Sequence, residues 1–134
     1  MRRLLSFGVV LVLASGCGPR VEFGNVSGEV TYNGRPLPNG RIAFICGAGD
    51  KPVLTAEIAD GRYELANVPA GPVEVTVETF NLRADPVPGG PPPNAVPKDY
   101  KFVKIPPRYG SAKDSGLGFN SAPGNQTQDF KLTP

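Results

Sequence analysis

The chain has 134 residues and contains no histidine, no tryptophan and two cysteines. Without histidine, Ser-His-Asp and Cys-His nucleophile systems are excluded, and so are most catalytic zinc sites, because imidazole serves as the base or ligand in them. We therefore expect no catalytic residues, no metal site and no cofactor, and we expect the protein not to be an enzyme. A hydrolase of an unrecognised type is a minor alternative.

Long apolar runs are also scarce. The longest covers residues 4–14, which is too short to span a bilayer, because a spanning helix needs roughly 20 apolar residues. Arg2 and Arg3 precede it, and a positive segment followed by a short apolar run is typical of a cleaved secretory signal. We predict a signal helix over residues 1–16, with cleavage between Gly16 and Cys17.

Small residues lead from this run directly into Cys17. A thiol is a soft nucleophile that can take a diacylglycerol in thioether linkage, and cleavage before Cys17 frees an amine for a further acyl chain. Each buried CH₂ contributes about 0.8 kcal/mol, so two or three chains anchor a protein stably whereas one binds marginally. The alternative is ordinary signal cleavage that leaves Cys17 as a free thiol.

Residues 14–17, Ala-Ser-Gly-Cys, resemble the lipobox of bacterial lipoproteins, although Leu13 lies one place before the usual leucine position. The resemblance implies lipidation of Cys17 and a membrane partner held through that lipid anchor. Gly18 follows the cysteine where an aspartate would mark retention. In bacteria with two membranes, this implies an exported protein of the cell envelope, anchored in the outer membrane.

The mature chain has no excess of charge. The sequence has 14 basic and 12 acidic residues, and setting aside Arg2 and Arg3 leaves 12 of each sign. Binding to nucleic acid is dominated by neutralisation of phosphates, so we expect no nucleic-acid partner.

Removing residues 1–16 from 134 leaves 118, which is enough for one domain with a substantial core. Residues 17–25 are expected to form the lipidated cysteine and a tether, and a flexible tether of eight residues spans roughly 16 Å. Residues 26–134 form the domain. Within it we interpret Cys46 as a small core hydrophobe rather than a reactive thiol, because it ends an apolar run.

Short alternating segments separated by turn residues fill most of the domain. We predict strands at 26–32, 41–46, 53–59, 62–65, 72–80, 102–105 and 127–132. Turns are expected at Asn33-Gly34, at Asp60-Gly61 and over 67–71, with a loop over 110–124. The predicted core includes Ile42, Phe44, Val73, Val75, Val77 and Phe130. With no long helix after residue 17, this pattern predicts an all-β, antiparallel sandwich of about seven strands.

Residues 81–99 are rich in proline and carry no periodicity. Proline removes a backbone donor and fixes φ, so the segment is expected to be extended rather than part of a sheet. Loops of this length are uncommon unless they are functional or disordered. It is either an extended contact surface or a slack connector.

A basic segment with interleaved aromatic residues follows this loop. The candidate partner-binding residues are Tyr100, Lys101, Phe102, Lys104 and Tyr109. The amines could meet anionic head groups or acidic polysaccharide while the rings stack on sugars. We favour a solubilising loop whose aromatic rings enter the core, because basic clusters alone are weak motifs.

Three motifs resemble the carboxypeptidase regulatory-like domain, a transthyretin-like β-sandwich of secreted and envelope proteins. They are residues 26–40, the turn at 59–65, and residues 68–71 before an alternating valine strand. The whole layout, closing with Asp-Phe-Lys-Leu at 129–132, resembles small bacterial lipoproteins with one such domain. The family's peptidase activity lies in a separate domain, and a related hydrolase branch relies on histidines, so neither activity is expected here.

Together these features predict a lipid-anchored, non-enzymatic envelope module. It would be structural or would bind a protein or glycan partner. The alternative is a carbohydrate-binding accessory protein that uses the aromatic residues near 100–109.

Overall fold

The computed structural model describes residues 16, 18, 20–47 and 52–134. Cys17 and the predicted signal, apart from Gly16, lie outside the described residues. The strands are β1 (Phe23–Tyr32), β2 (Arg35–Pro36), β3 (Asn39–Cys46), β4 (Val53–Ala59), β5 (Arg62–Pro69), β6 (Gly71–Glu78), β7 (Leu117–Ser121), β8 (Gly124–Thr127) and β9 (Phe130–Leu132). Three helical turns accompany them: η1 (Pro93–Ala95), η2 (Pro107–Gly110) and α1 (Ala112–Ser115). Among the described residues, no helix is long and apolar enough to cross a membrane.

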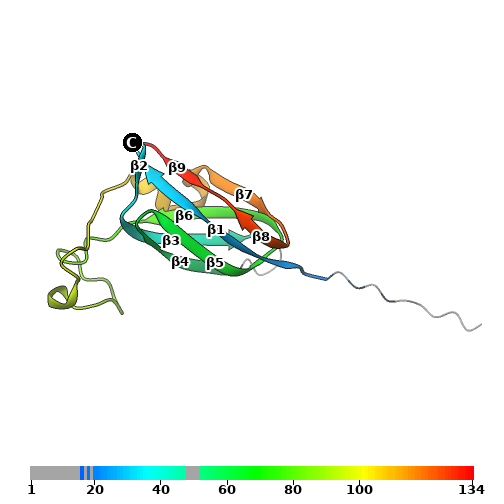
Figure 1. Cartoon of the computed structure of the whole chain (residues 1–134), viewed down its shortest axis with the longest axis horizontal. Coiled ribbons are helices and arrows are strands. Elements are labelled where there is room, and N and C mark those ends of the chain that lie inside the picture. Colours follow the sequence, from blue (N-terminus) through cyan, green and yellow to red (C-terminus); the bar gives the residue numbers. More distant parts are fainter. Residues whose placement is uncertain (1–15, 17, 19, 48–51) are drawn as a thin grey trace, which may run out of the picture.

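β1, which lies near the N-terminus, pairs with the last two strands of the chain as well as with β5 and β2. Along one edge it pairs antiparallel with β5 and then with β2. Along its other edge it pairs parallel with β8 and then with β9 (Figure 1). The full order is β2-β1-β5-β4-β3-β6-β7, with β8 and β9 beside β1. The all-β prediction is confirmed, but the pairing is not antiparallel throughout, because the C-terminal strands run parallel to β1.

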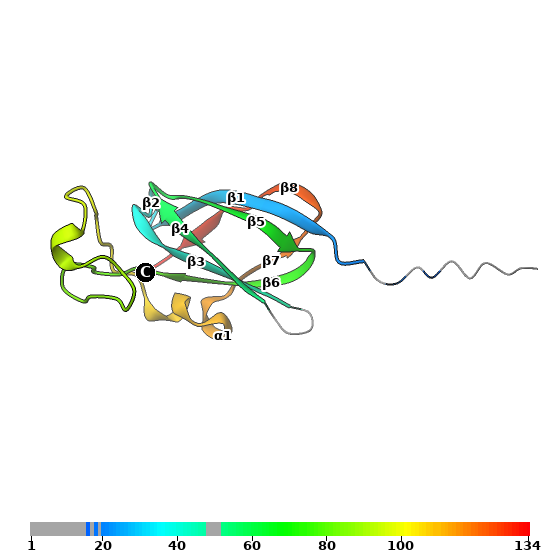
Figure 2. The same cartoon turned by 90° about the horizontal axis from the view of Figure 1, so that it is seen from below.

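The sheet curls so that β1 and β5 lie over β3 and β6 (Figure 2). Its weakest joint is between β4 and β5, where the described ladder contains one residue pair, Ala59 with Arg62. Asp60 and Gly61 between them have φ of 51° and 77°, which is the left-handed geometry that Asp-Gly turns tolerate. Beyond this hairpin β4 and β5 diverge. Packing of side chains, rather than hydrogen bonds between these two strands, therefore has to keep the two parts of the curled sheet together.

The ring of Phe44, in β3, lies at the centre of that packing. It makes edge-to-face contacts with Tyr63, Phe119 and Phe130 at centroid distances of 5.8, 5.2 and 6.4 Å. These partners come from β5, β7 and β9, and such aromatic pairs contribute roughly 0.5–1.5 kcal/mol each beyond burial. The six predicted core residues are all buried, which confirms that prediction.

Three local predictions were wrong. The turn expected over 67–71 is shorter, because β5 continues to Pro69 and pairs with β1. Residues 102–105 are extended chain and not a strand. The loop expected over 110–124 contains α1, β7 and the start of β8, and β7 pairs antiparallel with β6.

The helical turns cover the outer face of β6. Thr76 alternates with the inward-facing Val75 and Val77 and so lies on the outer face, yet its side chain is buried. Ser115 at the end of α1 donates a hydrogen bond to the carbonyl oxygen of Val75 at 2.7 Å, so this cover is fixed to the strand. Around Thr76 the strand therefore has protein on both faces, whereas Glu74 and Glu78 on the same side remain exposed.

The C-terminal segment approaches β1 closely. A Cβ on Gly28 would overlap the carbonyl oxygen of Gln128, so this position has to be glycine. Where β7 gives way to β8, the side chain of Gln126 accepts from the amide of Ala122 at 3.0 Å and donates to the carbonyl of Asn120 at 3.2 Å. A side-chain amide thereby joins the two strands at the point where the chain turns.

The facing of β6 gives a test of the fold. Val75 has no exposed surface, so Val75→Asp would bury a carboxyl group without a partner. We expect the loss of several kcal/mol, a large part of the roughly 5–15 kcal/mol typical of a domain, and no cooperative unfolding transition in circular dichroism. Glu74→Gln, on the exposed face next to it, should melt like the native protein. A soluble Val75→Asp variant with native melting would contradict the assigned facing.

Candidate functional site

The proline-rich segment 81–99 leaves the sheet after β6 and forms a large loop at one end of the molecule. The N-terminal segment enters at the opposite end of the long axis (Figure 1). Within this fully described loop there is a single helical turn, η1, and no strand. The prediction that this segment lies outside the sheet is confirmed, but the segment contains turns and η1 and is not extended throughout.

Hydrogen bonds tie the two ends of this loop together. The guanidinium of Arg83 donates to the carbonyl oxygens of Pro97, Lys98 and Tyr100 at 2.6, 3.3 and 3.1 Å. The hydroxyl of Tyr100 donates to the carbonyl of Phe80 at 2.8 Å. Hydrogen bonds from a charged group are among the stronger ones in proteins, so the loop is fixed at its base.

A groove of about 420 Å³ lies between this loop and the ends of β3 and β4. We call it the loop groove. One side comes from the two strands, and the other comes from Phe80, Tyr100 and the proline-rich segment itself. Its lining residues are Asn39, Gly40, Arg41, Glu57, Ile58, Ala59, Phe80, Leu82, Val87, Pro88, Gly89, Gly90, Pro91 and Tyr100.

The loop groove carries one charge of each sign. Arg41 and Glu57 are direct partners across the β3–β4 ladder, with Arg41 Nε 3.6 Å from Glu57 Oε1. The guanidinium also lies over the ring of Phe80, 5.1 Å from its centroid. Both charged side chains keep much of their exposure, 42% and 78%, so the pair contributes little to stability. Donors and acceptors therefore remain available to a ligand.

Tyr100 is the aromatic residue that joins the loop to the charged pair. Burial raises the pKa of its hydroxyl, and the nearby Glu57 carboxylate raises it further against an opposing effect of Arg83. The hydroxyl is thus protonated at neutral pH and can serve as the donor to Phe80. Lys101, which follows Tyr100, is fixed by Asn39. The side-chain amide of Asn39 donates a hydrogen bond to the carbonyl of Lys101 at 3.1 Å.

The structure separates the five predicted partner-binding residues. Tyr100 is half-buried and lines the loop groove, and Lys101 is exposed next to it. Phe102 and Lys104 are exposed and line a second, smaller groove of about 300 Å³ beside Glu78. They do not converge with Tyr100 on a single site.

Tyr109, the third aromatic residue of the set, lies in the core. Its side chain is buried, and its hydroxyl donates to the carbonyl of Thr133 at 3.1 Å and accepts from the Thr133 amide at 2.8 Å. Arg108 packs over the outer side of the ring, 4.8 Å from its centroid. The ring therefore holds the C-terminus against η2 and has no free face for a sugar, as the interpretation of a core aromatic residue predicted.

Cys46 lies in the core, as predicted. It is buried, and burial raises the pKa of its thiol, so the nucleophilic thiolate is disfavoured. In the part of the chain that the structure describes, no three His, Cys, Asp or Glu side chains come close enough to hold a metal ion. Cys17, the predicted lipidation site, lies outside the described residues.

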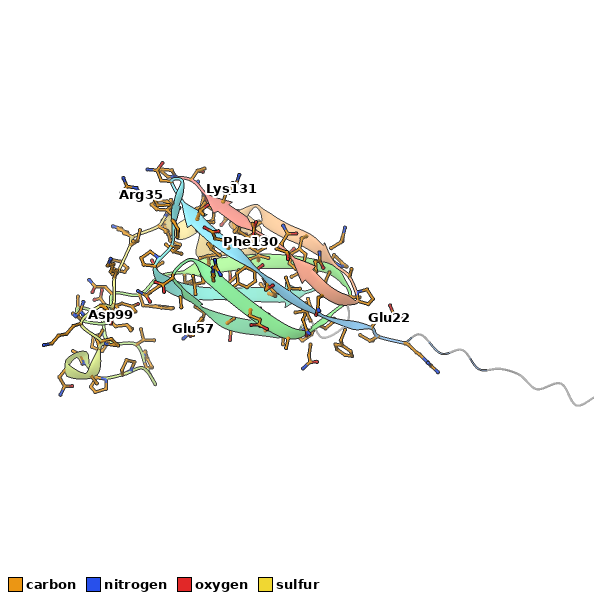
Figure 3. All side chains as sticks on the ribbon, viewed as in Figure 1. Glu22, Arg35, Glu57, Asp99, Phe130 and Lys131 are labelled. Atoms are coloured by element: carbon orange, nitrogen blue, oxygen red, sulfur yellow. The ribbon has the colours of Figure 1, made fainter. Side chains whose placement is uncertain are left out.

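Sequence reasoning missed the residues that form most of the loop groove. Glu57 points outward from β4 toward the side of the molecule that carries Asp99, while Glu22 lies at the far end (Figure 3). Arg41, Glu57 and Phe80 are spread over forty residues of sequence: Arg41 is in β3, Glu57 is in β4, and Phe80 follows the end of β6. One feature of the sequence could have pointed to them: each lies close to the end of a strand that faces the long proline-rich segment.

Comparison with models of known protein families and with curated proteins finds no match. Among solved structures, the chain is similar to the crystal structure of a DUF3823 family protein from Parabacteroides merdae ATCC 43184. The identity is 14% and the TM-score is 0.45, over 86% of this chain and 48% of that protein. The chain thus spans about half the length of that protein, and a likeness at this level assigns no function.

The anchoring of the loop by Arg83 can be tested directly. Arg83→Gln removes the charged donor of three hydrogen bonds, so local opening of the loop should become easier by about 1–2 kcal/mol. Trypsin cleavage after Lys98 should then be about 5–30 times faster, with little change in global melting. Asp85→Asn changes an exposed side chain in the same loop and should cleave at the native rate. Equal rates in all three proteins would show that Arg83 does not hold the loop.

Proposed function

We propose that the protein is a lipid-anchored, non-enzymatic binding module of the bacterial cell envelope. The anchor is Cys17, which the signal-like segment and the small residues before it support. The domain is a transthyretin-like β-sandwich of the carboxypeptidase regulatory-like type. The divergence of β4 and β5 after one residue pair and the aromatic core between the diverging strands support this finer assignment.

The partner site of this module is the loop groove. The observation that carries this proposal is the anchored loop: a segment of nineteen residues with no sheet partner is nonetheless tied together at its base by Arg83 and borders a groove with β3 and β4. A loop with fixed ends presents its groove at a low cost in ordering on binding. The loop that borders this groove lies at the end of the domain opposite the N-terminal segment (Figure 1), so an anchored protein would present the groove away from the membrane.

The chemistry of the loop groove favours a glycan as the ligand. Arg41 supplies donors and Glu57 supplies acceptors, so both sides of a sugar hydroxyl can be satisfied. Phe80 and Tyr100 supply apolar ring surface beside them. Tyr100 is the one member of the predicted aromatic set that takes part, and Phe80 takes the place that Tyr109 was expected to fill.

A protein partner is the second candidate, and a different observation favours it. The segment 86–93 is exposed over nearly its whole length and contains five prolines. Extended proline-rich segments are recognised by aromatic-lined grooves of other proteins because little conformational entropy is lost on binding. In this arrangement the loop itself, rather than the groove beneath it, is the contact surface.

The glycan proposal is tested by titrating the native protein with polysaccharide and peptidoglycan fragments isolated from a Gram-negative envelope. Arg41→Gln should weaken binding about tenfold, since a charge-assisted hydrogen bond contributes roughly 1.5–3 kcal/mol. Arg35→Gln removes an exposed arginine of β2 outside the groove and should bind as the native protein does. Affinity electrophoresis gives the dissociation constants, and melting curves confirm that each variant is folded.

Two outcomes would count against it. If no glycan fraction retards the native protein, the protein-partner candidate takes precedence. If glycan binding is present but unaffected by Arg41→Gln, the ligand lies outside the loop groove.

A further inference from the structure

The apolar surface of the domain is concentrated at one end. Among the described residues, four large hydrophobic side chains are exposed: Val21 at 64%, Phe23 at 55%, Val53 at 58% and Phe102 at 41%. Phe23 opens β1 and Val53 opens β4, and both strand starts lie at the end where the N-terminal segment enters (Figure 2). Three of the four exposed hydrophobic side chains thus gather at the end opposite the loop groove.

A groove of about 610 Å³ lies at this same end, and we call it the entry groove. Its walls are largely apolar and include three prolines. The lining residues are Arg20, Val21, Glu22, Phe23, Cys46, Gly47, Pro52, Pro69, Ala70 and Pro72. Proline lacks a backbone donor, so this surface offers few groups that would bind water or a polar ligand.

The exposed side chains at the entry groove are held in place by the sheet. Phe23 is the direct partner of Pro69 at the start of the β1–β5 ladder. The amide of Ala70 donates to the carbonyl oxygen of Glu22 at 2.8 Å, so the backbone before Phe23 is also fixed. Phe23 is therefore presented from a rigid strand, although a phenyl ring half in water is unfavourable for an isolated domain.

Charge does not explain this surface. Arg20 and Glu22 are the charged side chains among the groove residues, and they have opposite signs. The surface thus offers no net attraction for a strongly acidic or basic partner. This surface is better suited to contact an apolar environment, because such contact needs no electrostatic attraction.

We propose that this end of the domain docks on the surface of a phospholipid bilayer, with Val21, Phe23 and Val53 inserted at the interface. The inference rests on the proposed lipid anchor. Cys17 lies six residues before Phe23, and an extended chain spans at most about 3.6 Å per residue, so the anchor keeps this surface within roughly 20 Å of the membrane. At such an effective concentration, even weak apolar contacts suffice for docking.

Docking fixes the orientation of the whole module. The start of β1, which lines the entry groove, and the proline-rich loop, which lines the loop groove, lie at opposite ends of the long axis (Figure 1). With the entry groove on the bilayer, the proline-rich loop points away from the membrane and toward envelope polymers. A tether alone would leave the domain free to tumble, so docking adds a defined direction to the proposed anchor.

The absence of tryptophan from the chain makes the test simple. Phe23→Trp introduces one fluorescent reporter in the docking surface. Phe102→Trp is the matched control, because Phe102 is also an exposed phenylalanine but lies beside Phe80 near the loop end. Each full-length variant is extracted from host membranes and reconstituted in phosphatidylethanolamine–phosphatidylglycerol vesicles with or without brominated acyl chains.

Brominated lipid should quench the Phe23→Trp emission by about half or more and leave the Phe102→Trp emission unchanged, because interfacial side chains lie about 5–10 Å into the head-group region. The Phe23→Trp emission should also shift to shorter wavelength when vesicles are added. Emission from both variants that is indifferent to bromine would overturn the docking proposal.

A second preparation separates docking from anchoring. Cys17 is coupled chemically to a maleimide-bearing phospholipid in a Cys46→Ala variant, so that the free thiol of Cys46 does not compete. Quenching at position 23 in the coupled protein supports docking even if the protein from cells carries no lipid, in which case the anchor proposal fails alone. A protein that sediments with vesicles but shows no quenching at position 23 would support the anchor and contradict docking.

Discussion

Packing around the ring of Phe44 holds together two groups of strands that share few backbone hydrogen bonds. β4 and β5 are joined by one described pair beside the Asp60-Gly61 turn, and at the other side a glutamine side chain joins the β7–β8 turn. Phe44 contacts rings from three other strands across that divide. The curl of the sheet, and with it the position of both ends of the domain, depends on this apolar contact.

The two ends differ in chemistry because they differ in what the strands leave uncovered. At the loop end, Arg41 and Glu57 lie side by side on paired strands, and the returning chain covers them only in part. At the entry end, β1 and β4 begin with apolar side chains that no other element covers within the described residues. One end therefore suits a hydroxyl-rich or peptide ligand, and the other suits an apolar surface.

The five longer strands up to residue 80 could be predicted because alternate residues of each are buried, whereas the two-residue β2, which is exposed, was missed. Burial of alternate residues leaves a period of two in the sequence, and the glycines and asparagines at φ > 0 mark the turns. The same logic found the inward-facing Phe130, two residues before the buried Leu132.

The other features of the fold and the site could not be predicted from the local sequence, because they depend on contacts between residues that are distant in the chain. β7 is short, with glycine on either side of Leu117, so it resembles a loop until its pairing with β6 is known. Thr76 is polar and yet buried, because α1 and η2 cover it from far along the sequence. The loop groove was missed for the same reason: its charged pair and its aromatic residues acquire meaning only when the curl and the anchored loop bring them together.

The proposed role depends first on the membrane anchor, and the intact mass of the N-terminal fragment of native, membrane-extracted protein tests this most directly. We expect a fragment that begins at Cys17 and carries the added mass of two or three acyl chains. A fragment that begins elsewhere, or that begins at an unmodified Cys17, would contradict it and would make the protein a freely secreted one.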